Sequence, residues 1–108
     1  MTTAASFDAV IHAPNRLQIC ALLAAVDSAE FSAVRDEVGL SDSVLSKHVK
    51  TLQDAGYVDV RKATVASRVR TWLALTKAGR AAFAGHVAAL QAIIAEAPAP
   101  AGRVRESV

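Results

Sequence analysis

Four side chains able to contact nucleic acid occur between residues 43 and 50. Two carry short hydroxyl groups and two carry long cationic chains: Ser43, Ser46, Lys47 and Lys50. On a helix they lie opposite the apolar Leu45, Val49 and Leu52, which are spaced to face a core. Hydroxyl and ammonium groups suit base edges and phosphates, so this face fits the major groove of duplex DNA. For this segment alone, an amphipathic helix with a solvated polar face is the alternative.

Further cations follow on two segments that alternate apolar and polar residues, over 57–62 and 68–75. This alternation predicts a β-hairpin whose tip is Ala63–Ser67. Arginine enters narrow minor grooves or straddles phosphates. We therefore expect Arg68 and Arg70 to contact DNA, with Lys62 next, and Trp72 to pack against a helix.

The positive charge is concentrated in the middle of the chain. Net charge is only +2 over 108 residues. Residues 41–80 hold eight basic and three acidic groups, whereas the first forty residues carry −3 and the remainder balance. A clustered positive segment is expected where a protein displaces counterions from a polyanion. Chance clustering on a solvated surface is the alternative.

Residue types for catalysis or metal binding are present but not grouped in the sequence. The three histidines, His12, His48 and His86, stand far apart, and no cysteine or acidic partner lies at ligand spacing. The single cysteine, Cys20, excludes a disulfide scaffold and lies on an apolar helix face. We expect a buried inert thiol there, with a one-cysteine redox switch as the alternative. We predict no enzymatic activity, no metal site and no cofactor.

The first elements of the chain are predicted to be helical. Pro14 suits the first position of a helix over roughly 14–26, and residues 7–12 form a short turn of helix before it. We expect Arg16, near the start of that helix, to form an ion pair with an acidic neighbour rather than to contact DNA.

The next two helices carry start and stop signals. Ser32 can cap a short helix that ends at Gly39, where glycine tolerates the left-handed conformation. Ser41 can cap a third helix that runs to roughly residue 55. Two helices joined by a glycine-containing turn of three or four residues form a helix-turn-helix.

The last helix is predicted to extend beyond the core. Thr76 caps about twenty residues that end before Pro98, and a helix of that length spans about 30 Å. We predict a two-fold dimer interface from this helix and the N-terminal segment, with simple core packing as the alternative. The interface residues would be Phe7, Val10, Ile11, Phe83, Val87, Leu90 and Ile94.

Length and composition predict one globular domain over residues 1–96 and a flexible tail over 97–108. The longest uncharged run, Ala81–Ala95, is too short to span a bilayer. No basic cluster precedes the apolar Leu17–Val26, so we predict no signal peptide, no membrane partner and a cytoplasmic location.

Four segments in this order and spacing carry a resemblance to a known family. They are His12–Leu17 (HAPNRL), Gly39–His48 (GLSDSVLSKH), Leu52–Val58 (LQDAGYV) and Arg70–Arg80 (RTWLALTKAGR). Over roughly residues 7–95 the chain resembles the small MarR/ArsR-like winged helix-turn-helix transcriptional regulators. The resemblance implies a mainly α fold with a two-stranded β-hairpin wing, in the order α-α-α-α-β-β-α, dimerising through the terminal helices. The chain departs from related wings in having no glycine at the hairpin tip.

These observations predict sequence-specific binding of double-stranded DNA by a homodimeric regulator, most simply a repressor, at an inverted repeat. The recognition helix, about 41–55, would enter the major groove, and the wing, about 61–70, would contact the minor groove or backbone. One alternative is a winged-helix protein-interaction module without DNA binding, although four basic residues on the hairpin disfavour it. Another is a DNA-binding regulator with a small-molecule ligand in the dimer cleft.

Overall fold

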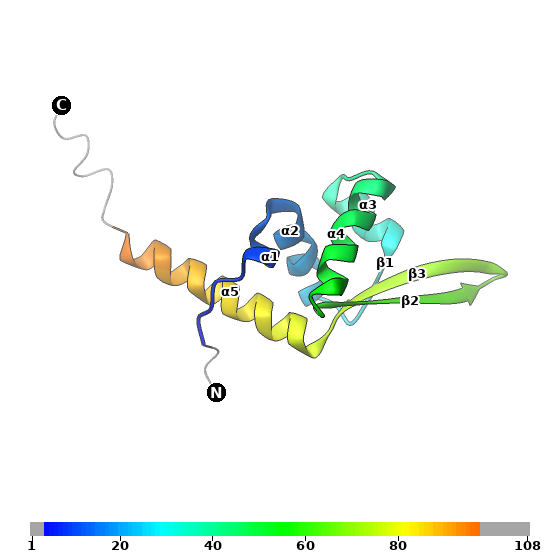
Figure 1. The fold of residues 1–108 in the computed structure, drawn as a ribbon. Helices are drawn as coiled ribbons and strands as arrows, with labels where there is room; N and C mark the ends of the chain where they lie inside the picture. Colours follow the sequence, from blue (N-terminus) through cyan, green and yellow to red (C-terminus); the bar gives the residue numbers. More distant parts are fainter. Residues whose placement is uncertain (1–3, 98–108) are drawn as a thin grey trace, which may run out of the picture.

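The computed structural model describes residues 4–97, so the predicted tail lies outside the described residues apart from Ala97. Figure 1 shows a small helical body from which the β2–β3 hairpin and the end of α5 leave in opposite directions. The elements in chain order are α1 (Ala9–His12), α2 (Pro14–Ala24), β1 (Ala29–Glu30), α3 (Phe31–Val38), α4 (Asp42–Asp54), β2 (Val58–Val65), β3 (Arg68–Leu75) and α5 (Lys77–Glu96).

The sheet is antiparallel and has the strand order β1-β3-β2. The predicted hairpin is confirmed, but β1 was not predicted. Its two residues, Ala29 and Glu30, pair with Leu73 and Trp72. Glu30 is also the N-cap of α3, so the prediction that Ser32 caps this helix is wrong. Because Glu30 is held extended by the sheet, the helix begins one residue before Ser32.

The hairpin is longer than the alternation predicted. Pairing continues from Val58 opposite Leu75 to Val65 opposite Arg68. The tip is therefore only Ala66 and Ser67, whose φ angles are 51° and 66°. Positive φ at both central residues is the pattern of a type I′ turn, which matches the twist of the flanking strands. The chain achieves this turn without glycine, although L side chains rarely adopt that conformation.

Three other helix boundaries follow local signals that were predicted. Gly39 adopts the left-handed conformation after α3, with φ at 72°. The hydroxyls of Ser41 and Thr76 each accept a hydrogen bond from the backbone N–H three residues later, at the starts of α4 and α5. Such caps typically stabilise a helix by about 1 kcal/mol. Together they fix the end of α3 and the starts of α4 and α5.

The core joins the helices to the base of the hairpin. Its buried members are Ile11, Ile19, Cys20, Leu23, Val34, Leu45, Val49, Leu52, Val58, Leu73 and Leu75. The prediction that Ile11 lies in a dimer interface is wrong, because this side chain is completely buried within its own chain. The prediction that Cys20 is buried is confirmed, and burial raises the pKa of its thiol to about 11. The thiol is therefore protonated at neutral pH.

The fold brings together two histidines that the sequence separates. His86 of α5 is completely buried, and its Nε2 lies 3.1 Å from Nδ1 of His12 in α1. The backbone N–H of Asp8 donates to Nδ1 of His86 at 2.9 Å. The ring of Phe7 packs against both imidazoles, with centroids 4.7 Å away. The expectation that all three histidines are scattered is therefore wrong for this pair.

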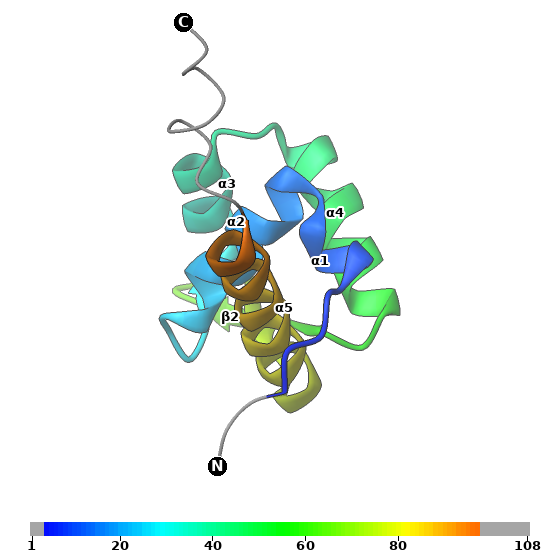
Figure 2. The same ribbon diagram turned by 90° about the vertical axis from the view of Figure 1, so that its left-hand side faces the viewer.

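The N-terminal segment is fastened to α5 and to the start of β2. Figure 2 shows it running beside α5, where the N–H of Ser6 donates to the carbonyl of Gly85 at 3.0 Å. The carboxylate of Asp8 accepts a hydrogen bond from the Tyr57 hydroxyl at 2.5 Å. Burial opposes ionisation of Asp8, but hydrogen bonds from Tyr57 and from backbone N–H groups lower its pKa.

By length and composition alone, α5 is long and apolar enough to cross a membrane. The prediction that the chain has no membrane-spanning segment considered only the shorter uncharged run Ala81–Ala95. Within the fold, however, Gly79, Gly85 and His86 of this helix are buried against the rest of the chain. These contacts bury part of the first half of α5, whereas the more apolar distal half exposes Ile93 and Ile94.

Candidate nucleic-acid interface

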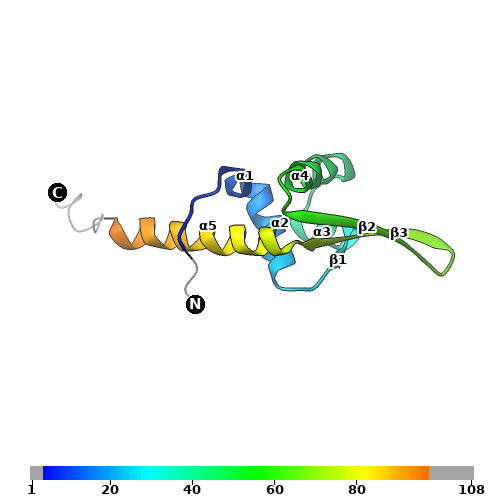
Figure 3. The same cartoon turned by 60° about the horizontal axis from the view of Figure 1, so that its bottom comes forward.

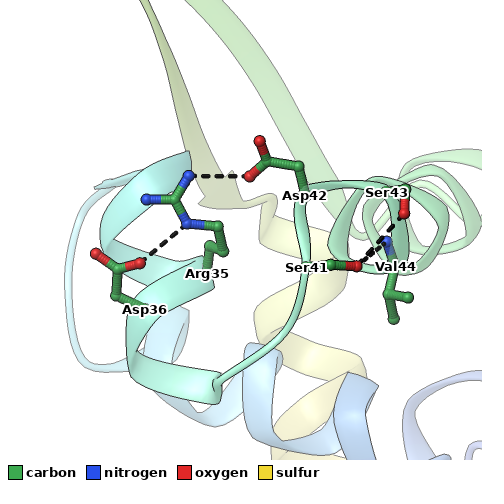
Figure 4. Close-up of polar contacts among 6 residues, drawn as sticks. All are labelled: Arg35, Asp36, Ser41, Asp42, Ser43 and Val44. Carbon is green, nitrogen blue, oxygen red and sulfur yellow. Dashed lines mark hydrogen bonds and ion pairs between the residues drawn. The ribbon is translucent and has the colours of Figure 1, made fainter.

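α4 presents one face to the core and the other to solvent, as its spacing predicted. Leu45, Val49 and Leu52 are buried. The four candidate contacts on the opposite face, Ser43, Ser46, Lys47 and Lys50, are all exposed. The Ser41 cap fixes the start of this helix, and Figure 4 shows that start beside the end of α3.

A groove of about 430 Å³ runs between α4 and the base of the hairpin. Figure 3 shows α4 lying alongside the hairpin strands that form its other wall. Ser46 and Lys50 line it from α4, and Lys62 lines it from β2. Three residues that the sequence singled out on two separate elements therefore meet at one surface. Its floor is apolar, formed by side chains such as Val49 and Leu73.

The remaining wing cations do not join this groove. Successive side chains alternate between the two faces of a strand. Lys62 and its cross-strand partner Thr71 face α4. Arg68 and Arg70 pair with Val65 and Ala63, which puts them on the opposite face of the hairpin. The predicted wing contacts are therefore divided between two surfaces.

Arg70 is committed to a structural ion pair. Its Nη1 lies 2.7 Å from Oε2 of Glu30, and both side chains are partly buried. Because Glu30 is in β1, this pair holds the unpredicted strand to the sheet. Its Nε is buried without a hydrogen-bond partner among the described residues. We therefore replace the expected DNA contact of Arg70 with this positioning role.

The outer face of the sheet has an open hollow of about 480 Å³. Trp72 and Arg61 line it from neighbouring strands, together with Asp27 and Asp59. Trp72, which we expected to pack against a helix, thus borders a surface hollow beside β1. Like the groove next to α4, it is lined by groups of both charge signs.

The lysines of α4 are available to a ligand. Lys50 Nζ lies 2.8 Å from Oδ1 of Asp54, one turn later, and both side chains are exposed. Exposed pairs of this kind contribute about 0–1 kcal/mol, so a phosphate can replace the carboxylate. Lys47 makes no ion pair with any of residues 4–97.

The turn before α4 is bridged by a residue that sequence reasoning missed. Figure 4 shows Arg35 of α3 between two carboxylates, with Nε 2.9 Å from Asp36 and Nη1 2.9 Å from Asp42. These hydrogen bonds raise the pKa of Arg35. Asp42 is the first residue of α4, where a carboxylate also interacts favourably with the helix dipole. Arg35 and Asp42 lie on different helices, so the spacing of residues within a helix could not identify this pair.

Among the described residues, Arg16 contacts neighbours of α2 but no carboxylate. Its Nε donates to the carbonyl of Val10 at 2.6 Å, and its Nη1 lies 3.4 Å from Nδ1 of His48 in α4. The expected ion pair of Arg16 is therefore wrong. Burial, and then the nearby guanidinium, lower the pKa of His48. Within residues 4–97, no three histidine, cysteine or acidic side chains gather into a metal site.

Comparisons with known proteins agree with this geometry. The sequence model of the winged helix DNA-binding domain family matches residues 15–94, which run from the start of α2 to the last turns of α5. The match includes α4, the hairpin and the groove between them. An uncharacterized protein of Methanocaldococcus jannaschii is 33% identical over 72 residues, covering 67% of this chain and 78% of that protein.

Solved structures share the fold. A transcriptional regulator homologue from Pyrococcus horikoshii OT3 has a TM-score of 0.76 and 28% identity, over 80% of this chain and 85% of that one. A homodimeric winged helix-turn-helix DNA-binding domain from Mycobacterium bovis, described as a possible ArsR-family regulator, has a TM-score of 0.59 and 22% identity. That likeness covers 81% of this chain and 73% of that one, and concerns the fold alone.

Proposed function

Because this chain belongs to the winged helix DNA-binding domain family, we propose that it is a homodimeric transcriptional regulator that binds a specific duplex sequence. In this proposal α4 enters the major groove and the hairpin contacts the adjoining backbone or minor groove. Occupying a promoter is the simplest way for such a domain to act, so we propose repression. The protein would work in the cytoplasm, with the DNA it binds, and without catalysis.

The groove between α4 and the hairpin is the observation that carries this proposal. Lys50 and Lys62 stand on its two sides, and Ser46 lies on the α4 wall. With α4 in the major groove, the phosphate strand that separates it from the adjoining minor groove would lie in this protein groove, where lysines on both walls can contact it. A short hydroxyl permits close approach to a base edge. The four residues of α4 and the wing cations Lys62 and Arg68 are the proposed contacts.

Exposed apolar side chains support the dimer. Ile93 and Ile94 on the distal half of α5 are 58% and 73% exposed, and Phe7 is 51% exposed. Val87 and Leu90 are only half-buried. A homodimer with the same fold, the Mycobacterium bovis domain, supports the same assembly here. The proposed interface consists of Phe7, Val10, Phe83, Val87, Leu90 and Ile94.

A two-fold dimer presents two copies of α4 to the DNA. Successive major grooves on one side of a duplex are about 34–36 Å, or about 10–10.5 base pairs, apart. Two symmetric recognition helices therefore favour an inverted repeat with half-site centres at about that spacing.

Replacing both lysines of α4 tests the proposed contacts. We expect Lys47→Ala/Lys50→Ala to weaken binding to every duplex, by at least about tenfold, and to reduce the slope of log affinity against log salt by about two per protomer. Fluorescence anisotropy at several salt concentrations measures both quantities. Lys77→Ala, which removes an exposed lysine from α5, is the matched control. Equal affinity in the double variant and this control would contradict the assignment of α4.

A further inference from the structure

Arg35 and its two carboxylate partners form a charged cluster at the helix-turn-helix. The cluster carries one positive and two negative charges and extends from α3 to the first residue of α4 (Figure 4). The arginine side chain is two-thirds buried, whereas Asp36 and Asp42 are largely exposed. The arginine therefore lies beneath two carboxylates that face solvent.

Asp42 lies where DNA would approach. It lines the groove next to α4, together with Lys50 and Lys62. A carboxylate on a surface that meets a polyanion repels the phosphates unless a cation offsets its charge. Arg35 is the cation within hydrogen-bond distance of this carboxylate, at 2.9 Å.

Arg35 also holds the turn through its backbone. Its carbonyl accepts hydrogen bonds from the N–H groups of Gly39 and Leu40, at 2.9 and 3.2 Å. Among residues 4–97, its guanidinium makes the only side-chain hydrogen bond that joins α3 to α4. A planar guanidinium can bind two carboxylates at once in fixed directions, which an ammonium group does less well.

We propose that Arg35 is a positioning residue for DNA binding. By lying within hydrogen-bond distance of both carboxylates, its guanidinium offsets the charges of Asp36 and Asp42, so that the first turn of α4 can approach the phosphate backbone. This inference rests on the proposed function. The ordinary alternative is a pair of surface ion pairs that leave binding unchanged.

The test compares a variant that lacks the charge of Arg35 with a variant in which Asp36 and Asp42 are neutralised as well. We expect Arg35→Gln to bind a 20-base-pair duplex about tenfold more weakly than the wild type at low salt, because two carboxylates then face the phosphates without an offset. Arg35→Gln/Asp36→Asn/Asp42→Asn removes the repulsion and should bind within about threefold of the wild type. Lys77→Gln, which removes one positive charge from α5, controls for net charge and should change affinity less than Arg35→Gln does.

The salt dependence of DNA binding distinguishes an electrostatic role of Arg35 from a structural one. The difference between Arg35→Gln and the wild type should shrink toward about 0.5 M salt, where charges are screened within a few ångströms. Thermal unfolding of every variant shows whether it is folded. If Arg35→Gln fails to fold, Asp42→Asn replaces it in the test, and this variant should bind more tightly than the wild type.

Three results would overturn the inference. The first is an Arg35→Gln protein that binds as well as Lys77→Gln. The second is a loss that persists in the folded triple variant, and the third is an Asp42→Asn protein that binds no more tightly than the wild type. A wild-type protein that binds no duplex at all would instead contradict the proposed function, and the inference with it.

Discussion

The imidazole of His86 is restricted to one neutral form by its neighbours. Asp8 donates its backbone N–H to Nδ1, so this nitrogen must be an unprotonated acceptor. The proton of the neutral ring is therefore on Nε2, which can donate to Nδ1 of His12. A proton added at Nδ1 would face the N–H of Asp8, donor against donor. Protonation must consequently loosen the contact between the N-terminal segment and α5.

We expect this contact to make stability depend on pH. Burial, and then the nearby His12, lower the pKa of His86 below its usual 6.5, while Asp8 partly opposes the shift. Between the lowered value and 6.5 the unfolded chain binds more protons than the folded one. Stability is therefore fully present above about 6.5 and falls as pH decreases. Urea unfolding at several pH values between 5 and 8 measures this change.

The variant His86→Gln should show a shallower dependence on pH over the same range. Some dependence should remain, because the pKa of His48 is lowered as well. Asp8 does not contribute in this range, since its pKa is already below 3.8. Equal stability of the wild type at pH 5 and pH 8, or an unchanged slope in His86→Gln, would be incompatible with this account.

Single residues were predictable from the sequence where a local period determined them. The spacing of Leu45, Val49 and Leu52 identified the outward face of α4, and with it Lys47 and Lys50. The contact of His12 with His86 joins residues 74 positions apart, and only the packing of α1 on α5 creates it. The spacing of residues within a helix or strand does not reveal a contact between residues so far apart in the sequence.

At the level of elements, three of the four predicted caps were correct, whereas the pairing of a short strand was not predicted. Gly39, Ser41 and Thr76 act through groups within a few residues, so the sequence alone locates them. β1 has two residues, which are too few to show alternation, and it exists because β3 offers it a free edge. The ion pair of Arg70 depends on that strand, so its role was mistaken for the same reason.

Gly79 allows α5 to approach the start of β2. A Cβ atom at this position would overlap the backbone carbonyl of Tyr57, which also accepts a hydrogen bond from Thr76 at 2.9 Å. We expect Gly79→Ala to lower the free energy of unfolding by about 1–3 kcal/mol, as overpacking does. Helix propensity alone would favour alanine by about 1 kcal/mol. A loss of stability would therefore show that overpacking against Tyr57 outweighs helix propensity.

Urea denaturation measures this free energy, and Ala84→Ser is the control on the same helix. Ala84 is exposed, so its replacement should stay within about 0.5 kcal/mol of the wild type. A Gly79→Ala protein as stable as the wild type would show that α5 does not pack this closely on the chain at Tyr57.

At the scale of the whole molecule, the two exposed ends have different chemistry. The hairpin and the distal half of α5 lie at opposite ends of the domain (Figure 3). A two-fold axis beside α5 would place the two hairpins far apart, as binding to successive grooves requires. The end of α5 exposes Ile93 and Ile94, which favours a second copy as its cover.

We expect Leu90→Glu/Ile94→Glu to convert the proposed dimer to a monomer of 11.3 kDa, because two charges on each protomer cannot be buried unpaired. Light scattering coupled to size-exclusion chromatography measures the mass. Val69→Glu is the matched control, since Val69 on the hairpin is 70% exposed and Ile94 is 73% exposed. A wild-type mass of one protomer, or an unchanged dimer in the double variant, would rule out this interface.

Sequence-specific duplex binding is tested most directly by fluorescence anisotropy with a labelled duplex taken from upstream of the chain's own coding region. A shuffled duplex of equal length is the control. We expect the native duplex to bind at least about tenfold more tightly, or about 1.4 kcal/mol, and both affinities to fall steeply as salt rises. Equal, salt-sensitive affinities would contradict specificity for this site. No binding at low salt would contradict DNA binding itself and favour a protein-interaction module.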